Sequence, residues 1–218
     1  MLQRPGETPP PMKSVMVLVR HGESEWNRRN IFTGWQDPDL SEEGVAEAHR
    51  AGALLKAEDF HIDCAFTSTL KRATRTLEII LSELDEDDIA VIQDAALNER
   101  DYGDLAGLNK DEARRRWGDE QVDLWRRSYD IAPPRGESLK DTAARVIPFF
   151  TKRILPELKA GNNVIVAAHG NSLRSLVMYL DRLSPQQVME LNIATGVPLI
   201  YRLRHDGSVA EKRDLVTS

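Results

Sequence analysis

The sequence predicts an α/β fold, a three-layer sandwich in which a mostly parallel central sheet carries helices on both faces. Two observations support this prediction. Apolar runs at residues 14–19 and 164–168 are each followed by a His-Gly pair, and such runs are typical of parallel strands covered on both faces. Segments with helical periodicity alternate with these runs. Because ligands bind at the carboxyl ends of parallel strands, both His-Gly pairs are expected at the binding edge.

The composition is that of a globular protein. The chain has 218 residues, of which 41% are hydrophobic and 29% charged, so a substantial packed core is expected. We expect one domain over residues 14–218. Residues 1–13 are rich in proline, which cannot join a helix interior or a central strand, so a flexible extension is expected there.

The net charge and the cysteine count exclude several classes of protein. A net charge of -6 argues against coating nucleic acid or binding an anionic membrane, because both partners favour a basic surface. No apolar run approaches the roughly 20 residues that a bilayer crossing needs. The single cysteine, Cys64, cannot form an intrachain disulfide, and we interpret it as a small buried side chain. A reducing, cytoplasmic location is therefore expected.

Periodicity defines the elements of the first half of the chain. Ser41 is expected to cap a helix, because two glutamates and a helical apolar pattern follow it. Residues 62–67 and 89–93 are strand-like. Apolar residues recur at three- and four-residue intervals over 69–84, which predicts an amphipathic helix with Arg72 in its first turn.

The second half begins with a segment that lacks clear periodicity. Residues 98–109 combine acidic, basic, aromatic and glycine residues, so we interpret them as a functional loop. The elements expected after it are two helices within 110–129 broken near Gly118, a helix from Ser138 kinked or ended by Pro148 and Pro156, a strand at 164–168 with a helix behind it, a capped helix from Ser184, and a strand at 197–203 followed by a turn and a short tail.

His21 and Gly22 form the most informative pair. A neutral imidazole nitrogen is a good nucleophile at pH 7, and a glycine lets backbone approach a reacting group closely. A single histidine after a strand is more often structural or solvated. The second pair, His169 and Gly170, together with Arg72 between them in sequence, favours a function over that interpretation.

The segment LVRHGESEWN at residues 18–27 resembles the signature of the histidine phosphatase superfamily, and in particular of its cofactor-dependent phosphoglycerate mutases. The same resemblance continues in FTGW (32–35), DLS (39–41), TSTLKRA (67–73), LNERDYG (97–103), GLNK (107–110), WRR (125–127), AHGNS (168–172) and GVP (196–198). It covers nearly all of the chain from residue 14 to about residue 201. A phosphoglycerate mutase-like catalytic domain is what this resemblance implies.

The resemblance implies a set of catalytic residues. His21 would accept the phosphoryl group, and Arg20, Arg72 and His169 would line its pocket. Such a donor set stabilises a transferring phosphoryl group without a divalent metal. Glu99 matches the acid/base carboxylate. Spacing alone leaves Asp101 as an alternative acid/base carboxylate, whereas the motif alignment favours Glu99.

The resemblance also implies how the substrate is held. A phosphoglycerate carries a carboxylate in addition to its phosphate, so a mutase needs more cations than a phosphatase. The middle segment offers Arg100 and several further candidates. The residues expected to contact substrate are Asn27, Thr33, Gly34, Tyr102, Lys110, Arg126, Arg127, Gly170 and Asn171. A bare Arg-Arg pair is otherwise usually a solvated helix face.

The function implied by the resemblance is interconversion of 3-phosphoglycerate and 2-phosphoglycerate, in glycolysis and gluconeogenesis. A phosphohistidine enzyme primed by 2,3-bisphosphoglycerate would carry the reaction, with no metal, and a homodimer is expected. One alternative is a phosphatase of the same superfamily. A second alternative is an inactive binding protein, which the intact catalytic set disfavours.

The chain departs from the best-known mutases of this family in two places. Residues 128–137 replace a long insertion, and the chain stops at Ser218 without a longer lysine-containing tail. Both parts help to cover the active site in relatives that have them. Since a mutase must shield its phosphohistidine from water, we expect a less completely covered site and a measurable side phosphatase activity.

Overall fold

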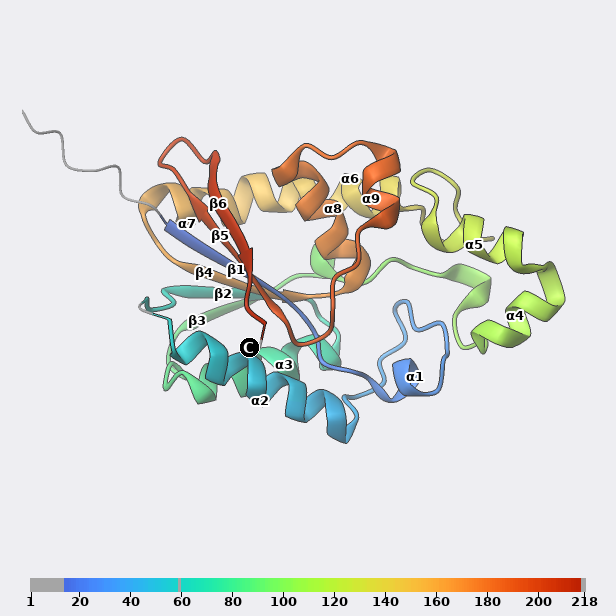
Figure 1. Cartoon of the computed structure of the whole chain (residues 1–218), viewed down its shortest axis with the longest axis horizontal. Helices are drawn as coiled ribbons and strands as arrows, with labels where there is room; N and C mark the ends of the chain where they lie inside the picture. The colour runs from blue at the N-terminus through green and yellow to red at the C-terminus, as the bar shows by residue number, and fades with distance from the viewer. Residues whose placement is uncertain (1–13, 59, 217–218) are drawn as a thin grey trace, which may run out of the picture.

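The computed structural model describes residues 14–58 and 60–216, so the expected extension at residues 1–13 lies outside the described residues. A six-stranded sheet runs through the molecule (Figure 1). Its order is β3 (Ala90–Gln93), β2 (Cys64–Thr67), β4 (Val164–Ala168), β1 (Ser14–Arg20), β5 (Pro198–Leu203) and β6 (Val209–Asp214). The first four strands pair in parallel, and β5 pairs antiparallel with both of its neighbours, β1 and β6. The mostly parallel sheet predicted from the sequence is confirmed.

Two hydrophobic clusters form on the two faces of the sheet because side chains alternate along each strand. Met16 and Leu18 of β1 point into one cluster, while Val15 and Val17 point into the other. The first face is covered by α6 (Leu139–Phe149), α7 (Leu155–Ala160) and α8 (Gly170–Asp181), and the second by α2 (Glu42–Lys56) and α3 (Lys71–Glu83) (Figure 1). This is the predicted three-layer sandwich.

Capping residues set the helix starts as the sequence predicts. The Ser41 hydroxyl accepts from the Gly44 amide at 3.1 Å, and Ser138 forms a capping box with Asp141. Ser184 caps α9 (Pro185–Glu190) in the same way. None of the helices described at residues 14–58 and 60–216 is long and apolar enough to cross a lipid bilayer.

The proline positions disturb the long helix as predicted. It passes from α6 into a π-helical turn, Phe150–Ile154, and then into α7. Pro156 lies in the first turn of α7, where its missing amide hydrogen costs least. The wider turn lets the helix axis continue although Pro148 and Pro156 cannot donate hydrogen bonds.

A smaller unit projects beyond the sandwich. It consists of α4 (Lys110–Trp117) and α5 (Asp119–Arg127), separated at Gly118, whose φ of 82° ends the first helix. Figure 1 shows this pair beyond the end of the sheet, on the same side of the molecule as the short helix α1 (Glu25–Arg28). Its own cluster consists of Phe32, Leu105, Ala113, Val122 and Trp125. The sequence predicted the break at Gly118 but not α1 or β6.

Candidate active site

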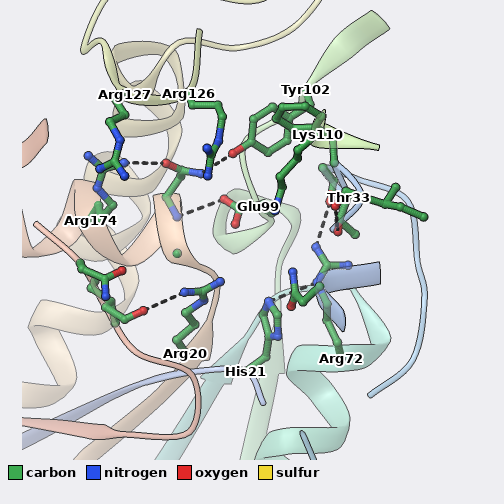
Figure 2. A pocket seen from close by; sticks show the side chains of 18 of the residues that line it. Arg20, His21, Thr33, Arg72, Glu99, Tyr102, Lys110, Arg126, Arg127 and Arg174 are labelled. Carbon is green, nitrogen blue, oxygen red and sulfur yellow. Dashed lines mark hydrogen bonds between the residues drawn. The ribbon is translucent and has the colours of Figure 1, made fainter. Parts of the chain in front are cut away.

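A cavity of about 170 Å³ lies where the strands β1 and β4 end. Figure 2 shows Arg20, His21 and Arg72 on one side of it, Tyr102, Lys110, Arg126 and Arg127 on the other, and Glu99 between them. The cavity is lined by Arg20, His21, Asn27, Ile31, Phe32, Thr33, Gly34, Arg72, Glu99, Tyr102, Lys110, Arg126, Arg127, Gly170, Asn171, Arg174, Leu191, Asn192 and Ile193. The structure therefore places every predicted site residue in the cavity wall, with the exception of His169.

His21 is held so that one ring nitrogen faces the cavity. Its Nδ1 lies 2.6 Å from the Gly22 carbonyl oxygen, so this nitrogen carries the hydrogen and donates it. Arg72 Nε donates a hydrogen bond to His21 Nε2 at 3.3 Å, so Nε2 is the ring nitrogen that carries the lone pair. Burial, together with Arg72 and Arg20, keeps the pKa of His21 well below its usual value. His21 is thus neutral at pH 7, and its Nε2 carries the lone pair of a nucleophile, which Arg72 Nε must release before Nε2 can attack phosphorus.

Gly22 allows this arrangement because the chain passes very close to α2. A Cβ at Gly22 would lie 2.1 Å from the carbonyl oxygen of Gly44, which is closer than any side chain tolerates. The Gly22 amide also donates to Thr76 Oγ1 at 3.1 Å. The sequence predicted close approach of the backbone to a reacting group, whereas the contact that requires a glycine here is with the backbone of α2.

His169 lies directly behind His21, with ring centroids 5.0 Å apart, and its side chain is fully buried. Ser68 Oγ lies 2.7 Å from His169 Nε2 and accepts from the Leu70 amide. Burial and the nearby Arg72 hold the pKa of His169 well below its usual value, so the ring is neutral. Among the described residues, Nδ1 of His169 has no hydrogen-bond partner.

The two arginines beside His21 come from different elements. Arg72, in the first turn of α3, is fixed by bonds from Nη1 to the Gln36 carbonyl and from Nη2 to the Gly34 carbonyl, each 2.9 Å. Burial lowers the pKa of Arg72 to about 10, so it still carries its charge at pH 7. Arg20 ends β1 and donates from Nη1 to the Ile193 carbonyl at 2.8 Å. Both guanidinium groups are thereby oriented before any ligand enters.

Glu99 is the one carboxylate among the described residues that line the cavity. Its Oε1 accepts from the amides of Asn171 at 3.1 Å and Arg100 at 2.8 Å. Asp101, which spacing left as a competitor, instead accepts from the Gly103 amide at 2.8 Å. Geometry therefore places the Glu99 carboxylate at the cavity and uses Asp101 in a turn.

The cations of the far wall come from the projecting unit. Lys110 begins α4, and Arg126 and Arg127 end α5, so both helices direct their charged residues into the same space. Burial lowers the pKa of both Lys110 and Arg126, which is the cost of holding like charges together away from water. An anion with more than one charged group would offset that cost.

Two cations differ from the prediction made on sequence. Arg100 is fully buried and supports the cavity wall from behind, because its Nη2 donates to the Arg126 carbonyl at 2.8 Å and to Tyr102 Oη at 3.2 Å. Arg174 lines the cavity although no motif predicted it there. It donates from Nη1 to Asn171 Oδ1 at 3.1 Å and from Nη2 to the Val188 carbonyl. Its spacing of three residues from Asn171 on α8 was the available signal.

Residues 16–214 match the family model described as histidine phosphatase superfamily (branch 1). A 2,3-bisphosphoglycerate-dependent phosphoglycerate mutase of Xanthobacter autotrophicus is 60% identical over 202 residues, which cover 93% of this chain and 98% of the relative. A relative of the same name from Nitrobacter winogradskyi is 63% identical over 201 residues, covering 92% of this chain and 97% of the relative. These matches confirm the resemblance found in the motifs.

Solved structures share the fold. A mycobacterial glucosyl-3-phosphoglycerate phosphatase has a TM-score of 0.79 at 25% identity, covering 94% of this chain and 99% of that one. A phosphoglycerate mutase from Bacillus anthracis has a TM-score of 0.73 at 23% identity, covering 92% of this chain and 92% of that one, a likeness of fold. The chain therefore belongs to the histidine phosphatase superfamily and, within it, to the family of the 2,3-bisphosphoglycerate-dependent phosphoglycerate mutases.

Proposed function

We propose that this enzyme interconverts 3-phosphoglycerate and 2-phosphoglycerate through a phosphohistidine at His21, primed by 2,3-bisphosphoglycerate, in glycolysis and gluconeogenesis. The carrying observation is a neutral, buried His21 whose Nε2 faces a cavity walled by cations on both sides, with one carboxylate between them. Relatives about 60% identical bear the mutase name, which supports the same substrate.

The transfer needs one nucleophile and one proton carrier. The bond between phosphorus and His21 Nε2 breaks as a bond to the substrate hydroxyl oxygen forms, and the Glu99 carboxylate takes the hydroxyl proton. The bisphosphoglycerate then turns, its other phosphoryl group moves to Nε2, and Glu99 returns the proton to the departing oxygen. Arg20 and Arg72 stabilise the charge on the transferring group, and His169 supports His21 from behind, so this step needs no metal.

The far wall distinguishes a phosphoglycerate from a simple phosphate ester. Lys110, Arg126, Arg127 and Tyr102 supply cations and a hydroxyl for the carboxylate and the second phosphate. Asn27, Thr33, Gly34, Gly170 and Asn171 add polar side chains or backbone groups at the rim between the walls. Holding the bisphosphoglycerate at both ends permits its reorientation without release.

A phosphatase of the same superfamily is the second candidate. Residues 128–137 contribute nothing to the described cavity wall, which supports the expectation of a less completely covered site. The Xanthobacter relative matches over 98% of its length, so it has little chain in which to hold a long insertion there either. We therefore propose a mutase with a measurable side phosphatase activity. We further propose that it works as a homodimer in the cytoplasm.

The test supplies 3-phosphoglycerate with and without 2,3-bisphosphoglycerate, in excess chelator, and follows 2-phosphoglycerate. Product that depends on the primer and not on metal is expected, together with a phosphoryl label on His21 that the His21→Ala variant lacks. Product that appears only when a divalent metal is added, or no product despite the primer, would contradict the proposal.

A further inference from the structure

We propose that Arg145 and Glu137 form a positioning pair that fixes Glu99 through the backbone of its loop, an inference that rests on the acid/base role proposed above. Glu99 lies between two short 3-10 turns, Ala95–Leu97 and Gly103–Leu105. Glu99 therefore belongs to no regular helix or strand of the described chain. A carboxylate that must meet a substrate hydroxyl needs its position fixed by neighbouring groups.

Arg145, on α6, binds the carbonyl groups on the near side of this loop. Its Nη1 donates to the carbonyl oxygens of Ala96 and Asn98, each at 2.9 Å. Its Nη2 donates to the carbonyl oxygen of Glu99 itself, also at 2.9 Å. Its Nη1 also lies 3.4 Å from the Ala95 carbonyl oxygen, so one rigid planar guanidinium group holds four carbonyl groups of a single segment.

Glu137 holds both the arginine and the far side of the loop. Its carboxylate accepts from Arg145 Nε at 2.9 Å and from Nη2 at 2.8 Å, a bidentate pair. Its Oε2 also accepts from the Asp101 amide at 3.1 Å, and its own amide donates to the Asp101 carbonyl at 2.8 Å. Burial opposes the charge on Glu137, but the bonds from Arg145 outweigh it and lower the pKa. Glu99 is therefore held between two fixed neighbours.

Trp35 adds a further donor to this support. Its Nε1 donates to the same Glu99 carbonyl at 2.7 Å, and its ring centroid lies 5.6 Å from the Arg145 guanidinium carbon. That carbonyl consequently accepts two strong bonds in a fixed plane. The Glu99 side chain then meets the amides of Arg100 and Asn171 in one orientation.

The position of Arg145 separates this role from support of the core. Helix α6 is anchored by buried Leu139, Ala143 and Val146 and by the Ser138 capping box, none of which involves Arg145. The side chain of Arg145 is 20% exposed and that of Glu137 22%. Removing the guanidinium group should loosen the loop while the sandwich stays folded.

The test compares two reactions that differ in their need for a proton. Isomerisation of 3-phosphoglycerate requires Glu99, whereas p-nitrophenyl phosphate has a leaving group that departs without a proton. We expect Arg145→Met to lower kcat for isomerisation by about 10- to 100-fold, and phosphatase activity on p-nitrophenyl phosphate by about twofold or less. Glu137→Gln should act in the same direction with a smaller loss.

A double-variant cycle identifies the group through which Arg145 acts. In a Glu99→Gln background, Arg145→Met should lower isomerisation little further, because the function it supports is already gone. The matched control is Arg213→Met, which removes a different partly exposed arginine–glutamate pair with Glu58, remote from the cavity, and should change neither reaction. Equal losses in both reactions, or full additivity with Glu99→Gln, would overturn the proposal.

The test also works if the proposed mutase function is wrong. Hydrolysis of glycerol 3-phosphate, whose alkoxide leaving group needs a proton, replaces isomerisation as the demanding reaction. Loss of glycerol 3-phosphate hydrolysis with retention of p-nitrophenyl phosphate hydrolysis still supports the positioning pair. Absence of isomerisation in the wild-type enzyme affects only the proposed function.

Discussion

The two walls of the cavity are built in different ways. The wall that carries His21, Arg20 and Arg72 belongs to the sandwich, where strand ends and a helix start fix each side chain against two large buried clusters. The wall that carries Arg126 and Arg127 belongs to the projecting α4–α5 unit, which rests on a cluster of five buried residues. An ion pair between Arg114 and Asp123, 2.7 Å apart, joins its two helices.

This difference separates chemistry from recognition. Phosphoryl transfer depends on sub-ångström alignment, so its groups gain most from a rigid setting. Binding the remote end of a substrate tolerates small movements, and a substrate that must turn around benefits from a wall that can shift. We infer that the sandwich wall determines whether phosphate is transferred, and that the α4–α5 wall determines which molecule receives it.

The largest expected effect comes from removing the two arginines of the α4–α5 wall. Arg126→Ala combined with Arg127→Ala should lower kcat/KM for isomerisation by about 10²-fold or more, because deleting one charged partner of an ion pair in a partly buried site costs about 2 kcal/mol or more. Hydrolysis of p-nitrophenyl phosphate should fall only a few-fold. Steady-state kinetics with both substrates measures the split, and parallel losses would contradict the division between the walls.

Local sequence pattern predicted the strand ends of the sandwich wall, for a physical reason. Buried strands such as β1 and β4 are continuous apolar runs, and the histidines follow them directly, so local pattern determines their place. Arg174 reaches the cavity from α8 and binds the Val188 carbonyl of α9, an interaction that no local pattern encodes. Motif resemblance supplied Lys110 and the Arg126–Arg127 pair where periodicity suggested only a charged helix face.

The sequence also failed to predict how deeply His169 is buried and that the sheet has an edge strand at β6. His169 was predicted among the pocket-lining residues, yet the structure places this ring behind His21, because β4 and β1 are adjacent and the ring packs beneath its neighbour. Strand β6 has a polar, largely exposed sequence, which resembles a tail until it pairs with β5. Long-range pairing, and not local propensity, decides such edge strands.

The second prediction concerns the stability of the sandwich wall. The pKa values of His21 and His169 both lie well below the usual 6.5 because of burial. As pH falls from 7.5 to 5.5, the unfolded chain therefore binds protons that the folded chain does not, and stability is lost. Each histidine should remove roughly 1.4 kcal/mol per pH unit below 6.5, so the free energy of unfolding should fall by about 2–3 kcal/mol.

Denaturant unfolding at the two pH values measures this difference. The double replacement His21→Gln and His169→Gln should reduce the pH dependence, whatever its effect on stability at pH 7.5. The matched control is His205→Gln, which makes the same substitution at an exposed position. An unchanged pH dependence in the double variant would show that other groups cause it.

The smallest expected effect comes from a matched pair of valines, one beneath each wall. Val166 of β4 lies in a sandwich cluster and Val122 of α5 in the α4–α5 cluster, and both are 0% exposed. Each Val→Ala change removes a similar buried apolar area and should lower the stability of the cluster that contains it by about 1–3 kcal/mol. Val166→Ala should lower the midpoint of global unfolding and leave KM for 3-phosphoglycerate within about twofold. Val122→Ala should lower that midpoint less and raise KM about three- to tenfold, because α5 positions Arg126 and Arg127. If both variants change KM equally, the two walls are mechanically one unit, and reorientation of the bisphosphoglycerate cannot depend on movement of α4 and α5 alone.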